Sequence, residues 1–243
     1  MKNKWFRIAF WLLIFAAWIS MVSFATVARN SAYCKGLIVN VITDEAPLFV
    51  QESDVLEIVH HHYDSLEKIL VEEINIDLLE ESLEGQAFVA NAEVYSSVNS
   101  ELRVDVYQHK ALLRVIHEKG SFYIDEEGKA MPLHSTVSAR VPVVTGFLPD
   151  SAFAEAFELI ELINEDEFLK AQITGMHRNR KGEFILYPRL GGHKIIFGQW
   201  DQEGEVKLKK LLTFYKEVIK KTGLDYYSQI DLRFEEQVVA TKQ

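Results

Sequence analysis

The sequence predicts an α+β protein in which one N-terminal membrane helix precedes two folded domains. An uncharged segment of 21 residues lies near the N-terminus, a region of mixed helix and strand patterns follows it, and strand patterns dominate the rest. The 243 residues suffice for two small domains. A hydrophobic content of 48% with 26% charged residues is typical of a folded chain.

The membrane helix is predicted at residues 8–28, which contain no charged side chain. A helix of this length spans about 30 Å, the thickness of the hydrocarbon core of a bilayer. Lys2, Lys4 and Arg7 precede it, so the positive-inside rule places the tail of residues 1–7 in the cytoplasm. We therefore expect contact with the lipid bilayer through residues 8–28.

A cleaved signal peptide is the alternative for this segment, with a cleavage site after Ala28. The apolar core of a signal peptide usually has only about 7–15 residues, which favours an uncleaved anchor. In either case the remainder of the protein is expected to be exported.

The charge of the sequence argues against a nucleic-acid partner, and its cysteine content excludes an intrachain disulfide and a cysteine-based metal site. All 36 acidic residues lie at or after Asp44, whereas five of the 26 basic residues precede it. A body this acidic would repel a phosphate backbone, so we expect no nucleic-acid partner. Cys34 is the only cysteine in the sequence, which excludes an intrachain disulfide and a cysteine-based metal site. The surrounding residues 30–36 are predicted to form a short stalk.

The first folded domain is predicted at residues 37–109, with the element order β-α-α-β-β. Apolar residues at helical spacing indicate the two helices, and alternating residues indicate the last strand. The expected elements are a strand at 37–42, helices at 52–63 and 76–83, and strands at 87–95 and 102–107.

The second domain, residues 110–243, is predicted to be β-rich with two helices. Glycine and polar turns separate its apolar runs. Helices are expected at 151–164 and 203–221, and strands at 112–117, 121–124, 141–145, 168–177, 183–188, 194–197, 229–234 and 237–240.

No motif predicts catalysis, a metal site or a cofactor. His60, His61 and His62 are adjacent on an expected helix, where consecutive side chains diverge by about 100° and do not converge on one ion. The Gly191–Lys194 segment precedes a strand, whereas a phosphate-binding loop precedes a helix. Pairs of acidic residues lie in polar stretches that equalise their environments. The sequence therefore predicts a protein that is not an enzyme.

Four segments resemble the FtsQ/DivIB family of bacterial cell division proteins. Residues 78–94 resemble the family's helix that leads into a strand, and residues 122–133 its Asp-x-x-Gly hairpin. Residues 141–146 resemble its Leu-Pro-x-hydrophobic-x-Gly strand, and residues 230–234 its closing Val-Asp-Leu-Arg-Tyr strand. They occur in the family's order, and their spacing is similar to versions from Bacteroidetes-type bacteria.

The resemblance implies a POTRA-like fold for the first domain and a non-enzymatic scaffold of the divisome. Such a scaffold recruits FtsB-like and FtsL-like coiled-coil division proteins, contacts other divisome membrane proteins, and links septum assembly to peptidoglycan synthesis. The implied location is the inner (plasma) membrane at the division septum, single-pass, with a cytoplasmic N-terminus and a periplasmic body.

The expected partner-binding site lies at the C-terminus. The resemblance implies that the last strand pairs with an FtsB strand and that Arg233, Phe234 and Glu236 contribute to this contact. The short apolar run of Gln237, Val238, Val239 and Ala240 independently predicts an edge strand that accepts a further strand. Ordinary closure of the sheet without a partner is the alternative for this run.

The alternative function is a membrane-anchored envelope hydrolase. It would require buried, converging carboxylates or a Ser/His pair in the β-rich domain, whereas a filled core and an open edge strand would favour the scaffold.

Overall fold

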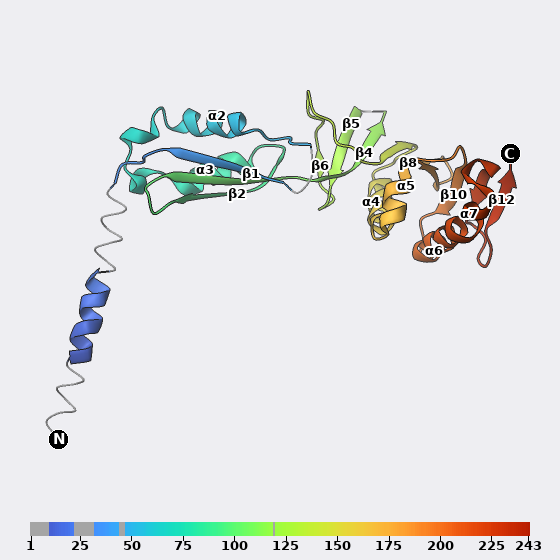
Figure 1. Cartoon of the computed structure of the whole chain (residues 1–243). Coiled ribbons are helices and arrows are strands. Elements are labelled where there is room, and N and C mark those ends of the chain that lie inside the picture. Colours follow the sequence, from blue (N-terminus) through green and yellow to red (C-terminus); the bar gives the residue numbers. More distant parts are fainter. Residues whose placement is uncertain (1–9, 22–31, 44–46, 119) are drawn as a thin grey trace, which may run out of the picture. The chain divides into compact units, whose positions relative to one another are not determined.

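A computed structural model describes residues 10–21, 32–43, 47–118 and 120–243. The chain divides into two compact units, Met1–Gln108 and His109–Gln243, and each is considered by itself (Figure 1).

The N-terminal helix differs from the prediction. Residues 10–21 are helical, and the rest of the predicted span lies outside the described residues. Among the described residues no helix is both long and apolar enough to cross a membrane. The prediction of a spanning helix at 8–28 is therefore wrong for the part of the chain that the structure describes.

Both ends of the predicted span lie outside the residues that the structure describes. Residues 1–9, with the predicted cytoplasmic tail, and residues 22–31 lie outside the described residues.

Unit 1 has the predicted β-α-α-β-β order. Its elements are β1 (Leu37–Ile42), α2 (Glu52–His62), the 3₁₀ turns η1 (Leu66–Lys68) and η2 (Val71–Glu73), α3 (Ile76–Glu84), β2 (Val89–Ser96) and β3 (Leu102–Gln108). The sheet order is β1-β3-β2, with β3 parallel to β1 and antiparallel to β2. Both helices lie on one face of this sheet (Figure 1).

The core of unit 1 follows from the alternation in β3. Leu102, Val104 and Val106 are buried and pack in one cluster with Leu79 and Leu83 of α3. Because side chains alternate across a strand, the polar residues between them lie on the other face of the sheet.

Cys34 corrects the prediction of a stalk at residues 30–36. Its side chain is 1% exposed and belongs to the core of unit 1. Its N–H donates to the carbonyl of Ile69 at 2.9 Å, and its thiol donates to the carbonyl of Gly36 at 3.3 Å. The described residues from 32 onward are therefore part of the folded unit.

Unit 2 is built on a mixed nine-stranded sheet of order β12-β11-β10-β9-β8-β7-β4-β5-β6. The β4–β7, β7–β8 and β10–β11 pairs are parallel, and the other neighbours are antiparallel. The strands are β4 (Ala111–His117), β5 (Gly120–Asp125), β6 (Ala130–Met131), β7 (Val143–Gly146), β8 (Ile173–Arg178), β9 (Glu183–Pro188), β10 (Lys194–Gln199), β11 (Tyr227–Asp231) and β12 (Val239–Lys242).

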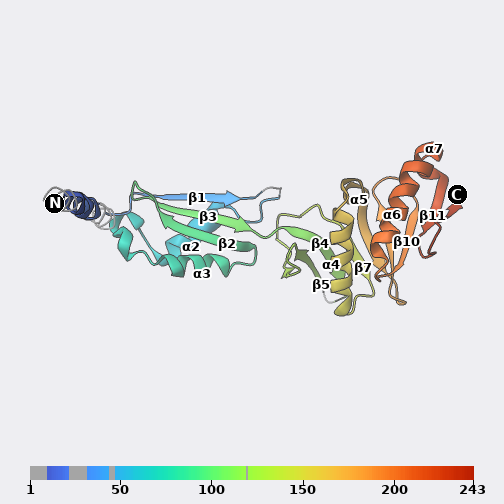
Figure 2. The same cartoon turned by 90° about the horizontal axis from the view of Figure 1, so that it is seen from below.

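Helices complete the core of unit 2. Buried residues of α4 (Ser151–Asn164) and α6 (Gly204–Phe214) share one apolar cluster with residues of the central strands. Figure 2 shows the two helices beside the strands of unit 2. A π-helical turn, η3 (Tyr215–Ile219), follows α6, and then come α7 (Lys220–Thr222) and the 3₁₀ turn η4 (Leu224–Tyr226). This region matches the helix predicted at 203–221, although no pattern predicted the π turn.

The short helix α5 (Glu167–Gln172) stands where a strand was predicted from residue 168. The Asp166 carboxylate accepts the N–H groups of Phe168 and Leu169, both at 3.0 Å, and so caps the helix. The strand β8 begins only at Ile173.

Candidate partner-binding site

The strand β12 forms one end of the nine-stranded sheet. It pairs antiparallel with β11, with Ala240 opposite Ile230 and Val239 opposite Asp231. Among the described residues no strand pairs with its other side. One row of its backbone groups is therefore available for strand addition.

The hydrogen bond after β12 indicates which backbone groups face outward. The N–H of Gln243 donates to the carbonyl of Tyr226, on the β11 side, at 3.2 Å. Backbone groups point to alternate sides along a strand, so those of Thr241 and Val239 also face β11. The N–H and C=O of Ala240 then face the open side. The bulge in this pairing lies in β11, between Tyr227 and Gln229, and leaves the alternation along β12 intact.

Arg233 fixes the start of the edge turn, which we define as residues 232–238. Its guanidinium donates to both carboxylate oxygens of Asp231, at 3.0 and 2.7 Å, and to Glu183 of β9 at 2.9 Å. Its aliphatic carbons lie over Gly198, where an added Cβ would come within 2.8 Å of Arg233 Cγ. The absence of a side chain at Gly198 thus makes room for this arginine.

These ion pairs shift all three ionisations toward the charged forms. Burial by itself would raise the pKa of Asp231, but the hydrogen bonds and charge of Arg233 outweigh burial and lower it. Hydrogen bonds from Asn179 and Arg233 lower the pKa of Glu183. Hydrogen bonds to Asp231 and Glu183 raise the pKa of Arg233. Arg233 is therefore engaged within its own unit and positions the edge turn.

Lys210 of α6 holds the same turn from the other side. Its ammonium group donates to the carbonyl oxygens of Leu232, Phe234 and Glu235, at 3.3, 2.5 and 3.2 Å. Three carbonyls converging on one cation fix the backbone of the turn. The side chain of Phe234 remains 44% exposed beside the edge strand.

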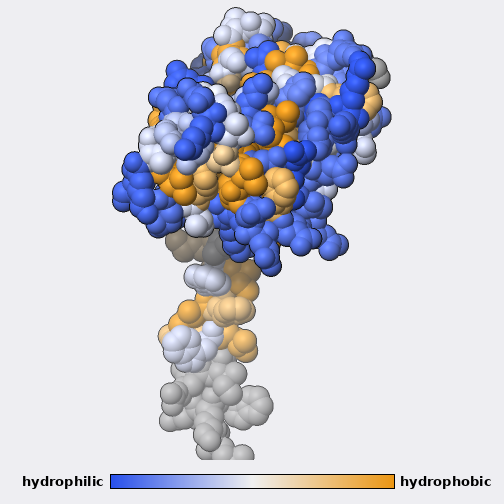
Figure 3. Space-filling model, turned by 90° about the vertical axis from the view of Figure 1, so that its right-hand side faces the viewer, coloured by the Kyte–Doolittle hydropathy of each residue, from blue (hydrophilic) through white to orange (hydrophobic). Residues whose placement is uncertain are grey.

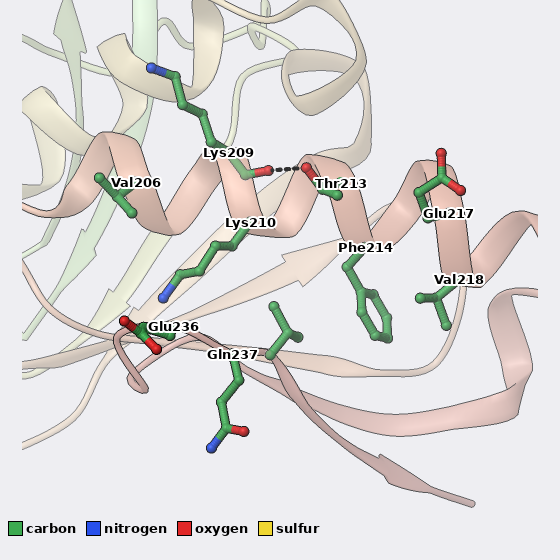
Figure 4. Close-up of a pocket in the computed structure, with 10 residues that line it drawn as sticks. Val206, Lys209, Lys210, Thr213, Phe214, Glu217, Val218, Glu236 and Gln237 are labelled. Carbon is green, nitrogen blue, oxygen red and sulfur yellow. Dashed lines mark hydrogen bonds between the residues drawn. The ribbon is translucent and has the colours of Figure 1, made fainter.

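A groove of about 430 Å³ lies between the helix and the edge turn. We call it the α6 groove; its lining residues are Val206, Lys209, Lys210, Thr213, Phe214, Glu217, Val218, Glu236, Gln237 and Val238. Figure 4 shows Lys210 and Phe214 pointing from the helix toward the edge turn, and Lys209 pointing to the opposite side. The Thr213 hydroxyl donates to the carbonyl of Lys209 at 2.9 Å.

The groove presents apolar side chains next to the open edge. Val206 is 50% exposed, and Phe214, Val218 and Val238 supply further apolar surface. In Figure 3, hydrophobic residues form a band between hydrophilic ones on the face of unit 2 seen there. An exposed apolar patch rimmed by polar residues is typical of an interaction surface.

The structure brings the predicted site residues together but divides them between two elements. Arg233, Phe234, Glu236, Gln237 and Val238 lie in the edge turn, and only Val239 and Ala240 belong to β12. The strand predicted at 237–240 therefore begins two residues later and extends to Lys242. Phe234 and the β12 edge are exposed, whereas the guanidinium of Arg233 is engaged internally.

Sequence reasoning missed Lys210, Glu183 and the groove residues of α6. The pattern at 203–221 identified a lysine-rich face of the helix, but the contact between Lys210 and the turn joins residues 22 to 25 positions apart. No local pattern predicts such a contact.

The histidines singled out by the sequence make ordinary structural contacts. His60 Nδ1 lies 2.7 Å from the carbonyl oxygen of Leu56, and His62 Nε2 lies 2.9 Å from the hydroxyl of Ser82. Within the part of the chain that the structure describes, no group of three or more His, Cys, Asp or Glu side chains is placed to hold a metal ion.

Comparison with known proteins gives matches to solved structures, one of which is described here, and to two family models. No curated protein matches the sequence significantly. The structure is the major extracytoplasmic domain of the trans isomer of the cell division protein DivIB from Geobacillus stearothermophilus. It is 17% identical, with a TM-score of 0.32, and the match covers 46% of this chain and 95% of that chain.

The two family matches together account for almost all of the described residues. Residues 32–107 match the POTRA-like domain, and residues 110–241 match the family described as FtsQ/DivIB, C-terminal related. The second match alone spans more than half of the chain, and its region contains the nine-stranded sheet with the β12 edge. The chain therefore belongs to the FtsQ/DivIB family, and this membership implies a role in cell division.

Proposed function

We propose that this protein is a non-enzymatic scaffold of the division septum that recruits FtsB-like and FtsL-like coiled-coil proteins. Through them it would link septum assembly to peptidoglycan synthesis, together with other divisome membrane proteins. The observation that carries the proposal is the open side of β12, where the backbone of Ala240 faces outward beside the exposed Phe234.

Strand addition supplies the main-chain part of this interaction. Each hydrogen bond between the partner strand and β12 contributes a net of about 0.5–1.5 kcal/mol. Specificity then comes from side chains beside the strand, and Phe234 is the exposed aromatic anchor that such interfaces favour. The α6 groove accepts apolar side chains from the segment that continues beyond the added strand.

We further propose that the body acts outside the cytoplasm, at the septum. Family membership supports this location, and the related DivIB structure is likewise of an extracytoplasmic domain. The acidic composition of the chain is compatible with protein partners and unfavourable for nucleic acid.

The buried carboxylates of unit 2 give no support to the hydrolase alternative. The Asp125 carboxylate accepts the N–H groups of Glu127 and Lys129, at 3.0 and 2.8 Å, and lies 2.8 Å from His109. Asp231 is paired with Arg233. Each carboxylate thus stabilises its own turn, and the two do not converge on a common site.

Capture of an FtsB-like partner by the full chain tests the proposal. Phe234→Ala should weaken binding by about tenfold or more, because an aromatic anchor contributes about 2 kcal/mol. Phe147→Ala is the matched control, since Phe147 is 53% exposed in the same unit but lies away from β12, after β7. Equal capture by both variants would place the interface elsewhere.

A further inference from the structure

A second site lies at the opposite end of the nine-stranded sheet. Residues 132–142 follow β6 and pass over β5, where Tyr123 is buried: its hydroxyl accepts the N–H of Ala139 at 3.1 Å and lies 3.2 Å from the hydroxyl of Ser138. A pocket of about 230 Å³ opens between this segment and β4, and Arg114 lines it.

The guanidinium of Arg114 is the unusual feature of this pocket. Its Nε is buried and has no hydrogen-bond partner. Among the described residues its guanidinium forms no ion pair, and its contact with an aromatic group is the Tyr123 ring, 6.0 Å from Arg114 Cζ to the ring centroid. A buried donor without a partner costs free energy, so such a group is expected to bond to an ordered water or to a ligand.

The other lining residues favour an anion. The pocket is lined by Arg114, Tyr123, Leu133, His134, Ser135, Thr136, Val137 and Ser138, which include four hydroxyl side chains and no carboxylate. His134 Nδ1 accepts the N–H groups of Thr136 and Val137, at 3.3 and 3.2 Å. The fixed arginine and the hydroxyl donors make this pocket a site for negative charge in an otherwise acidic protein.

We propose that this pocket binds a carboxylate, held by the guanidinium of Arg114 and the hydroxyls of Ser135, Thr136 and Ser138. One guanidinium matches a single negative charge, and its planar fork pairs with a carboxylate in a bidentate manner. The pocket is smaller than the roughly 300–1,000 Å³ of a site for a drug-sized ligand, so it admits one residue of a peptide. That carboxylate belongs either to the C-terminus of a peptide or to an acidic side chain.

Titration of the ¹⁵N-labelled full chain distinguishes these two sources. The probes are N-acetyl-Ala-Ala with a free carboxylate, its C-terminal amide, and an N-acetyl-Asp peptide blocked at its C-terminus. Binding should shift the Nε–H signal of Arg114 and the backbone amides of residues 135–138. A shift with the first probe alone assigns a chain terminus, and a shift with the blocked Asp probe alone assigns a side chain.

Two substitutions at Arg114 separate charge from geometry. Arg114→Gln removes the charge and should weaken binding by about tenfold or more, since hydrogen bonds to charged groups contribute about 1.5–3 kcal/mol. Arg114→Lys keeps the charge but loses the fork and should retain only part of the affinity. Arg140→Gln, at an exposed arginine that does not line the pocket, should bind like the unaltered chain.

Three results would overturn the proposal. The first is the absence of these shifts with either carboxylate probe at about ten millimolar, a concentration at which even weak specific binding is visible. The second is an equal shift with the amide probe. The third is tighter binding of inorganic phosphate than of either carboxylate. The first two are read on the unaltered chain, so they hold even if an Arg114 variant fails to fold.

Discussion

The guanidinium of Arg233 lies 2.9 Å from the carboxylate of Glu183, although 50 positions separate the two residues in the sequence. This contact joins the edge turn after β11 to β9, two strands away in the sheet order. Together with the bidentate pair to Asp231, it makes the turn beside the open edge a fixed structure. A preformed edge requires less ordering on binding, which favours affinity.

Replacement of Arg233 by alanine should destabilise unit 2 and loosen the edge turn. Asp231 is buried and would lose both hydrogen bonds from the guanidinium, and it would keep the one from the backbone N–H of residue 233 only if the turn holds. The partial exposure of Arg233 moderates the loss, so we expect about 1–3 kcal/mol in the free energy of unfolding. Urea denaturation measures it. Arg180→Ala, at an exposed arginine in the β8–β9 turn, serves as the control and should change stability little.

The same cluster predicts a loss of stability in acid. The pKa values of Asp231 and Glu183 are lowered in the folded chain, so the folded state binds fewer protons than the unfolded state at low pH. Their stabilising contribution is complete above the unfolded values of about 3.9 and 4.3, and it is lost as pH falls through the lowered folded values.

Arg233→Ala should remove the part of this acid dependence that comes from Asp231, because burial would then dominate the pKa of Asp231, whereas the hydrogen bond from Asn179 still lowers the pKa of Glu183. Unfolding measured at a series of pH values between 6 and 2 tests it. An unchanged slope in the variant would show that other carboxylates account for the acid dependence.

His193 predicts a second pH effect at milder acidity. Its Nε2 lies 2.7 Å from the hydroxyl of Tyr215, and the ring is 1% exposed. Burial lowers the pKa of His193, and it raises the pKa of Tyr215 to about 12. The folded state therefore favours neutral imidazole, so stability is intact above the unfolded pKa of about 6.5 and decreases as pH falls below it.

His193→Gln keeps a hydrogen-bonding side chain but does not titrate, so it should remove this decrease. The readout is the slope of the unfolding free energy between about pH 7 and pH 5. His60→Gln is the control, because His60 is exposed on α2 in the other unit. The same slope in both variants would assign the effect to other groups.

Local patterns in the sequence predicted the elements of this fold better than their ends or their long-range contacts. The alternation of Leu102, Val104 and Val106 identified β3 and its buried face. The apolar run after Asp166 was interpreted as one strand, but the cap at Asp166 converts its first residues to α5. The prediction of a membrane-spanning helix rested on the length and lack of charge of residues 8–28, and it is wrong because no helix among the described residues is long and apolar enough to cross a membrane.

The candidate site was predictable only in part for a similar reason. Phe234 and the apolar run from Val238 to Ala240 stand out as local features at the end of the chain. The contacts of Lys210 and Glu183 with the edge turn arise from the pairing of β11 with β10 and from the packing of α6, which a single sequence does not display. Arg233 lies in the edge turn, where its guanidinium bonds to Asp231 and Glu183 and stabilises the turn.

The direction of the backbone in β12 gives the sharpest test of the open edge. Proline removes a backbone N–H and places its ring on that side of the strand. At Ala240 the N–H faces outward, so Ala240→Pro should leave the pairing with β11 intact, block an incoming strand, and weaken capture of an FtsB-like partner by about tenfold or more. At Thr241 the N–H faces β11, so Thr241→Pro should lower the stability of the edge itself. Thermal unfolding and partner capture are measured on both variants. Undiminished capture by a folded Ala240→Pro variant would contradict strand addition at β12, and the opposite pattern of stability would show that the two residues face the other way.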